Sequence, residues 1–169
     1  MLIFKNNKII RNKNCNNYLT TTNRCDRIFL TIIKEKELLN MKVLVLSSGE
    51  LKTQEIGTEL EDLQKIVGGY IEIPFLGHKF SNNGIDVIIN EEGKLIDGMK
   101  PEIAIVNEER GSILDIVYGN CIFASHDEEG NTIGLNEEQI QIVTEELETV
   151  IELMNKRTFA EFEVRALFI

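Results

Sequence analysis

The amino-acid sequence predicts an α+β domain, with a mostly antiparallel sheet and with its helices packed on one face of that sheet. Short apolar runs of strand length are separated by turn residues, and two segments place their apolar residues on one helical face. The order of these segments is strand, helix, several strands and then a long helix, which favours the α+β class. The apolar share of 43% is ordinary for a globular protein.

The first predicted strand is Lys42–Leu46, an uninterrupted apolar run that is typical of a buried strand. The polar stretch Ser47–Glu59 is expected to connect it to a helix over Leu60–Val67. Within that helix, apolar residues recur on one face, and the glycine pair that starts at Gly68 is a common helix stop. The alternating segment Tyr70–Phe75 predicts the next strand.

A loop is expected over Leu76–Gly84, because this stretch is polar and rich in Gly and Asn. A short apolar strand follows at Asp86–Asn90, with a tight turn that leads into Leu95 and Ile96. For residues 102–107 the pattern is apolar and fits either a helix or a strand. The run Ile113–Ser125 has the highest apolar content, interrupted at Gly119.

A hairpin turn at Asp127–Asn131 returns the chain through Thr132–Leu135, and Asn136 then begins the clearest helix as its N-cap. Its core-facing stripe consists of Ile140, Val143, Leu147, Val150, Ile151 and Met154. Residues 158–169 form an apolar tail that fits a short helix or an edge strand. We expect the tail to dock on its own core or on a second subunit.

The charge is divided unevenly along the chain. The whole sequence holds 18 Lys+Arg and 28 Asp+Glu, a net charge of −10. Residues 1–40 hold eight Lys+Arg and three Asp+Glu, a net charge of +5. Residues 41–169 therefore hold ten Lys+Arg and twenty-five Asp+Glu, a net charge of −15. A body this acidic is expected to repel nucleic-acid phosphates and to attract basic partners. Direct nucleic-acid binding is therefore not expected.

Residues 1–40 also differ from the rest in composition, since they are rich in Asn and lack Gly and Pro. The codons for Lys36-Glu37 can read AAG-GAG, a bacterial ribosome-binding sequence, at a suitable spacing before Met41. We therefore expect translation to start at Met41. Residues 1–40 are then a non-native or disordered extension, 41–157 the acidic α+β domain, and 158–169 the docked tail.

Four segments carry a family resemblance. They are Leu63–Glu72, Asn90–Leu95, Asp115–Asn120 with the following Asp127–Gly130, and Leu135–Ile140. In this order they resemble the domain-of-unknown-function 3846 family of phage, plasmid and bacterial chains, over about Met41–Leu147. The resemblance implies a start near Met41 but no activity. The stretch Met99–Ala104 departs from the family pattern, which usually has Pro and Asn there.

No catalytic, cofactor or metal site is expected. Cys15, Cys25 and Cys121 are too few and scattered for a disulfide framework or a zinc site, and Cys121 lies in an apolar run. His78 and His126 have no metal-ligand spacing, and the sequence contains no nucleophile motif or phosphate loop.

The sequence therefore favours a non-enzymatic accessory protein of a phage or mobile element that binds a host or viral protein. One alternative is a small-molecule binder or sponge for a nucleotide signal, with Arg110, Tyr118 and Phe123 as the candidate ligand-binding group. The other is an acidic DNA mimic. Its candidate acidic face on the last helix consists of Glu137, Glu138, Glu145, Glu148 and Glu152.

The sequence contains no apolar stretch of about 18 residues that could span a membrane, and its N-terminus lacks the compact apolar core of a signal peptide. We expect a cytoplasmic protein, in the host cytoplasm if it is viral. A homo-oligomer through the C-terminal tail is a further expectation.

Overall fold

The computed structural model describes residues 4–5, 8–9, 40–155 and 160–169. The chain divides into two units, residues 1–38 and 39–169. In the first unit, β1 (Phe4–Lys5) and β2 (Lys8–Ile9) form an antiparallel pair. The predicted non-native or disordered extension, residues 1–40, otherwise lies almost wholly outside the described residues. The second unit carries the fold that follows.

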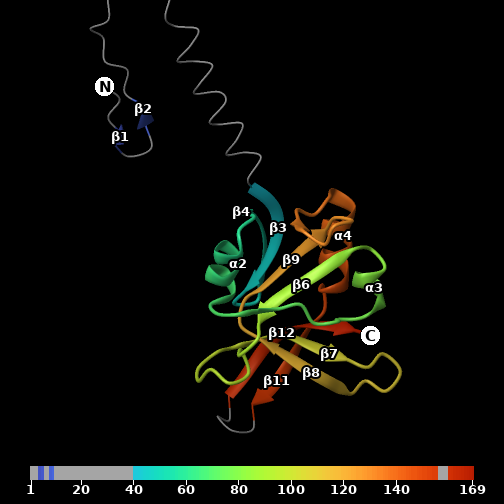
Figure 1. Cartoon of the computed structure of the whole chain (residues 1–169). Coiled ribbons are helices and arrows are strands. Elements are labelled where there is room, and N and C mark those ends of the chain that lie inside the picture. The colour runs from blue at the N-terminus through green and yellow to red at the C-terminus, as the bar shows by residue number, and fades with distance from the viewer. Residues whose placement is uncertain (1–3, 6–7, 10–39, 156–159) are drawn as a thin grey trace, which may run out of the picture. The chain divides into compact units, whose positions relative to one another are not determined.

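The larger sheet of this unit is antiparallel throughout its described pairings, in the order β4-β3-β9-β6-β5 (Figure 1). Its strands are β3 (Asn40–Ser47), β4 (Glu50–Gly57), β5 (Ile71–Glu72), β6 (Ile85–Asn90) and β9 (Cys121–His126), and β10 (Thr132–Ile133) pairs with β9. The hairpin predicted around Asp127–Asn131 is confirmed by this last pairing.

Strand β4 corrects the expectation that Ser47–Glu59 is a connecting stretch. Its side chains are mostly exposed, and only Ile56 is buried. An edge strand of this kind needs few apolar residues, because one neighbour supplies its backbone hydrogen bonds and most of its side chains meet water. Because β4 is mostly polar, it lacks the alternation of apolar and polar residues by which a strand is predicted from sequence. In the other direction, the strand predicted over Tyr70–Phe75 is only Ile71–Glu72, and Pro74 cannot donate a hydrogen bond to prolong it.

The smaller sheet has the order β11-β12-β7-β8 and consists of β11 (Val150–Asn155), β12 (Ala160–Phe168), β7 (Pro101–Val106) and β8 (Ile113–Tyr118). Strand β12 runs parallel to β7, while the other two pairings are antiparallel. Residues 102–107, left open between helix and strand, are thus largely extended. Within the described part of the tail, Ala160–Phe168 is an internal strand instead of an edge strand or a helix. The described residues show no strand at Leu95 and Ile96, which lie in turns.

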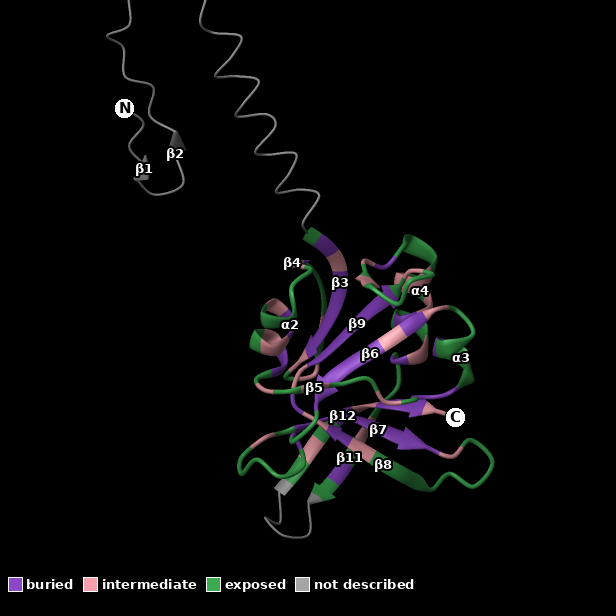
Figure 2. Cartoon of the chain, viewed as in Figure 1, coloured by how far each residue is buried: buried purple, intermediate pink, exposed green. Residues whose placement is uncertain are grey.

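The main core lies between the two sheets, where buried side chains from both meet, with Phe80 of α3 (His78–Ser81) and Val143 of α4 (Glu137–Glu146) among them. A second cluster lies on the opposite face of the larger sheet, under Leu63 and Val67 of α2 (Leu60–Val67). Figure 2 shows that strands β3, β6 and β9 of the larger sheet, which lie between the two clusters, are mostly buried. The α+β class with mostly antiparallel strands is confirmed, but the helices cover both faces of the larger sheet.

The end of helix α2 and the start of helix α4 lie where their sequence signals predict. Helix α2 spans the predicted residues and ends at Gly68, whose φ of 82° is a left-handed conformation that glycine adopts without strain. Helix α4 begins with a capping box, in which Asn136 and Gln139 each accept from the other's backbone N–H.

Helix α4 is much shorter than the predicted apolar stripe and ends at Glu146. Thr149, Val150 and Ile151 are β-branched and favour an extended chain. Strand β12 offers them a pairing partner, with Val150 opposite Arg165. The stripe residues Val150, Ile151 and Met154 therefore lie on β11 instead of on a helix.

The β3–β4 hairpin turn is tied to the smaller sheet by two partly buried interactions. At the turn, Ser48 and Gly49 have φ values of 54° and 77°, and both backbone N–H groups donate to the carboxylate of Glu102, at 2.7 and 2.8 Å. Glu102 is 4% exposed and is the extra residue of a β-bulge in β7. The guanidinium of Arg165 on β12 donates to the Gly49 carbonyl at 3.1 Å and to the Leu147 carbonyl at 3.1 Å. We call Glu102, Arg165 and this turn the clasp.

The clasp predicts a large cost for removing its carboxylate. Glu102→Ala leaves two amides of the turn without an acceptor and should lower the free energy of unfolding by about 2–4 kcal/mol, measured by chemical denaturation. Glu102→Gln retains one acceptor oxygen and should fall between that variant and the wild type. Glu128→Ala, at an exposed turn position, serves as control and should change stability by less than about 0.5 kcal/mol. Equal stability of Glu102→Ala and the control would contradict this account of the clasp.

Candidate functional site

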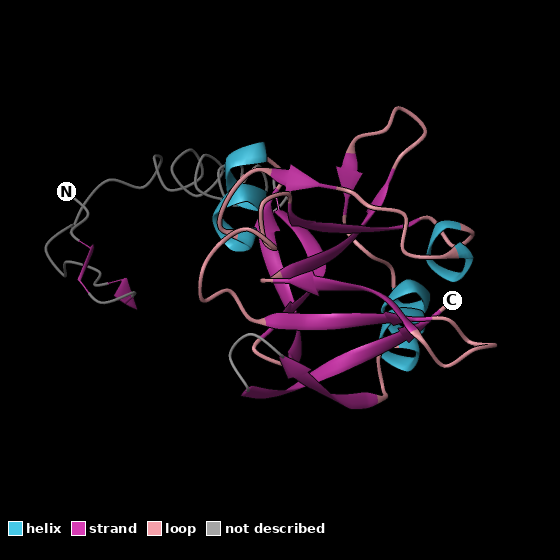
Figure 3. Ribbon diagram, turned by 90° about the horizontal axis from the view of Figure 1, so that it is seen from below, coloured by secondary structure: helices cyan, strands magenta, loops and turns pink. Residues whose placement is uncertain are grey.

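The outer face of the smaller sheet, which is turned away from the larger sheet, is apolar. Along β12, Phe162, Val164, Ala166 and Phe168 belong to an apolar cluster separate from the main core, whereas Leu167 packs into the core. All the described members of this cluster come from the four strands of the sheet. Figure 3 shows the sheet from this side, with no described helix across it. No described helix lies over this face, but its central side chains, Ala104, Val164 and Ala166, are at most 1% exposed, so a partner can reach the face only at its margins.

A groove of about 630 Å³ crosses one end of this face. Its walls are the turn that follows Lys94, the outer side of β8 and the β11–β12 hairpin. The apolar lining residues are Ile96, Met99, Pro101, Ile113, Ile116, Tyr118, Leu153, Met154 and Phe162, while Lys94, Asp97 and Glu152 supply the charged lining groups. Met154 and Ile113 are 56% and 46% exposed, so a partner can reach both.

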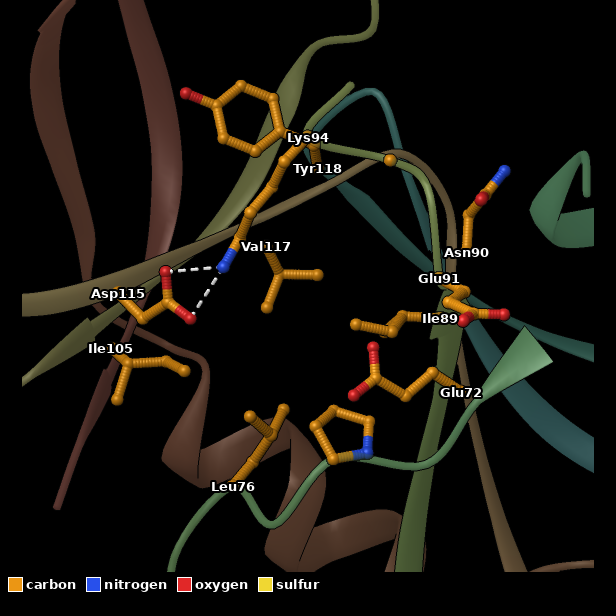
Figure 4. A pocket seen from close by; sticks show the side chains of 12 residues that line it. Glu72, Leu76, Ile89, Asn90, Glu91, Lys94, Ile105, Asp115, Val117 and Tyr118 are labelled. Atoms are coloured by element: carbon orange, nitrogen blue, oxygen red, sulfur yellow. Dashed lines mark hydrogen bonds and ion pairs between the residues drawn. The ribbon is translucent and has the colours of Figure 1, made fainter. Parts of the chain in front are cut away.

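A second and smaller hollow, the cleft, lies between the two sheets and has a volume of about 130 Å³ (Figure 4). Its apolar lining is well packed, since Leu76, Ile89, Ile105 and Val117 are each at most 8% exposed. The polar lining groups are Glu72, Asn90, Glu91, Lys94, Asp115 and Tyr118. Figure 4 shows Glu72 and Lys94 extending into the cleft from different segments.

An ion pair spans part of the cleft. The Lys94 ammonium donates to both carboxylate oxygens of Asp115, at 2.7 Å each, and the Ile116 backbone N–H donates to Asp115 Oδ1. Partial burial pushes the pKa of Asp115 up, but these hydrogen bonds and the Lys94 charge outweigh it and leave the pKa below its ordinary value. Asp115 is therefore ionised at neutral pH.

Strand β8 separates the groove from the cleft, because successive side chains of a strand point to opposite faces. Asp115 and Val117 line the cleft, Ile113 and Ile116 line the groove, and Tyr118 borders both. Leu114 has no partner in the β7–β8 register and marks a bulge. Since β8 is the last strand of its sheet, the two hollows meet around a strand edge.

The structure does not bring together the group Arg110, Tyr118 and Phe123 that was predicted to bind a small molecule. Phe123 is fully buried in the main core. Arg110 is exposed in the β7–β8 turn, whereas Tyr118 is at the other end of β8. A ligand therefore cannot contact Phe123, and Arg110 and Tyr118 lie at opposite ends of one strand. Of the three, Tyr118 alone lines a described hollow.

The predicted acidic face on the last helix is also corrected. Glu137, Glu138 and Glu145 are exposed on α4, but Glu148 follows the helix and Glu152 is on β11. Their spacing assumed a helix that continues past Glu146, which the β-branched residues after it prevent. The side chain of Glu137 also forms an ion pair with Lys42, at 2.5 Å. These carboxylates do not form one helical face.

The described residues contain no group of three or more potential metal ligands. His126 Nδ1 lies 2.8 Å from Asp86 Oδ2 at the end of β9, an ordinary surface pair. Cys121 is fully buried, and burial, together with the nearby Glu102 charge, raises the pKa of its thiol. Such a thiol stays protonated and is a poor nucleophile.

The groove could not be predicted from the sequence, because its walls come from segments that are distant along the chain. Lys94 and Asp97, Ile113 and Ile116, and Leu153 and Phe162 meet only after the sheet has formed. One signal did exist, in the tail. There, apolar and charged residues alternate from Glu161 to Arg165, which is typical of a strand with one apolar face.

Comparison with known proteins gives one match. The family model described as "Domain of unknown function (DUF3846)" matches residues 41–148, which confirms the resemblance and its extent. No curated protein and no solved structure matches the chain. No helix among the described residues has the length and apolar character that crossing a bilayer requires.

The lowered pKa of Asp115 predicts a pH-dependent contribution to stability. Because the folded state favours the ionised form, that contribution is present above the ordinary Asp pKa of about 3.9 and is lost as pH falls through the lower folded value. Asp115→Asn should therefore be slightly less stable than wild type at pH 7, by less than about 1 kcal/mol for so exposed a pair.

The gap in melting temperature between Asp115→Asn and wild type should shrink below about pH 4, measured by circular dichroism. Asp97→Asn, in the neighbouring turn, is the matched control and should follow the wild-type curve. A gap that stays constant to low pH would rule out this role of the ionised carboxylate.

Proposed function

This chain belongs to the domain-of-unknown-function 3846 family, and we propose that it acts by binding another protein and not as an enzyme. In this proposal it is a cytoplasmic accessory protein of a phage or mobile element, and its partner is a host or viral protein. The observation that carries the proposal is the apolar groove on the outer face of the smaller sheet.

The chemistry of the groove suits protein binding. Its volume of about 630 Å³ is large enough to take several partner side chains. Met99 and Met154 are flexible, polarisable side chains that adapt to different apolar shapes. Interface cores are poor in charge and rich in aromatic and methionine side chains, and Tyr118 and Phe162 add two aromatic rings.

The acidic body specifies the chemistry of the partner further. Residues 41–169 carry a net charge of −15, and Asp97 and Glu152 line the groove. A partner with apolar side chains flanked by Lys or Arg would bury the former in the groove and be attracted to the latter. Electrostatic attraction of this kind raises the association rate and selects against acidic proteins.

The other two candidate functions have less support. A nucleotide sponge needs arginines at a pocket, but Arg110 is in an exposed turn and Arg165 is engaged by backbone carbonyls in the clasp. Neither lines the groove or the cleft. Arg165 does line a separate hollow of about 510 Å³ beside α4, but Glu145 and Glu148 line it too and would repel a phosphate. A DNA mimic needs a regular acidic array, whereas the candidate carboxylates are divided among a helix, a connection and a strand.

The groove proposal predicts that charged residues at its exposed rim abolish partner binding without unfolding the protein. Ile113→Asp and Met154→Asp should each weaken the complex about tenfold or more, because each places an unpaired carboxylate against the partner's apolar side chains. The measurement is quantitative capture from host lysate with residues 1–169, followed by titration of the purified captured protein.

Leu60→Asp is the matched control, since Leu60 is 49% exposed on α2, on the other side of the larger sheet. It should bind like wild type, and all three variants should keep the wild-type melting temperature within a few degrees, about the shift expected for a surface change. Binding that survives in both groove variants would refute the groove as the binding site.

A further inference from the structure

We propose that the free edge of β8 binds an extended segment of the partner by strand addition. Alternate side chains of that segment are apolar, directed to the groove, and basic, directed to the cleft. This inference rests on the proposed protein-binding function and specifies its mode. It follows from the position of β8, from the hollows on its three open sides and from the charges that line them.

The outer edge of β8 carries no strand in the described part of the chain, since β7 pairs with its other side. A shallow hollow of about 430 Å³ runs along this edge, lined by Lys94, residues 113–116 and Tyr118. Ile113 and Leu114 are 46% and 56% exposed there. An added strand would satisfy the backbone groups along the edge and cover both side chains.

The β4 edge of the larger sheet is protected in a way that β8 is not. Strand β4 ends the larger sheet and exposes Glu50, Lys52, Gln54 and Glu55. Charged and polar side chains at an edge discourage strand addition. At β8, by contrast, two large aliphatic side chains are exposed, and Asp115 is its one charged residue. Strand β11, the other edge of the smaller sheet, also exposes Val150 and Met154, but neither the acidic cleft nor the hollow along a strand edge is lined by it. The structure therefore points to β8.

The alternation of the partner follows from strand geometry. Neighbouring residues of an added strand point to opposite faces of the sheet, and every second residue is about 7 Å further along one face. Side chains on the outer face would enter the groove among Ile113, Ile116 and Tyr118. Those on the inner face would enter the cleft beside Asp115 and Val117.

The cleft favours a basic side chain. Glu72, Glu91 and Asp115 line it against one ammonium, that of Lys94, which leaves two negative charges in excess. Its buried apolar lining, with Leu76 and Val117, suits the aliphatic stem of a lysine or arginine. At about 130 Å³ the cleft accommodates one side chain and is small for a nucleotide.

The ion pair between Lys94 and Asp115 would have to open when a strand binds at this edge. Asp115 accepts from Lys94 and from the Ile116 amide, so its carboxylate occupies part of the edge before a partner binds. Both side chains are about half exposed, at 55% and 53%, and ion pairs so exposed are weak. An incoming basic side chain can therefore replace Lys94 at Asp115 without leaving the carboxylate unpaired.

The test uses the full chain and synthetic peptides. The probe is an end-blocked peptide of about eight residues, a typical strand length, that alternates valine and lysine. Three control peptides share its length: glutamate replaces lysine, the valines and lysines are grouped into two blocks, or the backbone nitrogens are methylated at alternate positions. Binding is measured by isothermal titration and by amide shifts in nuclear magnetic resonance spectra.

We expect the alternating peptide to bind and to shift the amides of β8. Each control peptide should bind at least about tenfold more weakly, because it lacks the charge, the alternation or the backbone donors. Glu72→Gln should also weaken binding, while Glu128→Gln should not. No binding of the alternating peptide, or equal binding of the methylated one, would overturn the strand-addition proposal.

The natural partner separates this inference from the function on which it rests. If Ile113→Asp abolishes partner capture but Leu114→Pro, folded by its melting temperature, retains it, the partner binds the groove by another mode and strand addition is wrong. If capture survives in the groove variants as well, the proposed function is wrong at this site. Loss of capture in both Ile113→Asp and Leu114→Pro, together with failure of the methylated peptide to compete with the partner, supports strand addition.

Discussion

The fold depends on one buried carboxylate. Glu102 holds the amides of Ser48 and Gly49, and Arg165 holds the carbonyl on the other side of the same turn. The two side chains come from neighbouring strands of the smaller sheet, while the turn belongs to the larger one. Since a buried charge is tolerated only when hydrogen-bonded, the two sheets are fixed in one relative position. The main core, the cleft and the placement of β8 all follow from that position.

The sequence was most informative where local chemistry decides the structure. The start and end of α2, the N-cap of α4 and the turn at Asp127–Asn131 depend on residues within a few positions of one another, and all appear as expected. The edge strand β4 was not predicted, because most of its side chains are polar and exposed. The predicted length of α4 was too great, because apolar positions on β11 continue the helical spacing by chance. Periodicity cannot distinguish these cases, since pairing with distant strands decides them.

The candidate site was less predictable than the fold. Tyr118 and Glu152 were named for other reasons, and both line the groove, although neither the ligand group nor the acidic face exists as expected. Sites assembled from separate strands leave no spacing in the sequence. The parallel pairing of Ala166 with Ala104 places the end of the chain beside its middle, and no local rule anticipates this register.

That same pairing has a consequence for how the protein is made. The family match ends at residue 148, before β11 and β12, yet β7 has a neighbour on its second side only when β12 is present. Strand β12 follows β7 by about fifty residues, so during synthesis the β7–β8 hairpin leaves the ribosome long before its central partner. In that interval Ile103 and Ile105 lie in a sheet with a second open edge. The nascent chain is therefore most exposed to misassembly or chaperone capture in the strand that carries Glu102.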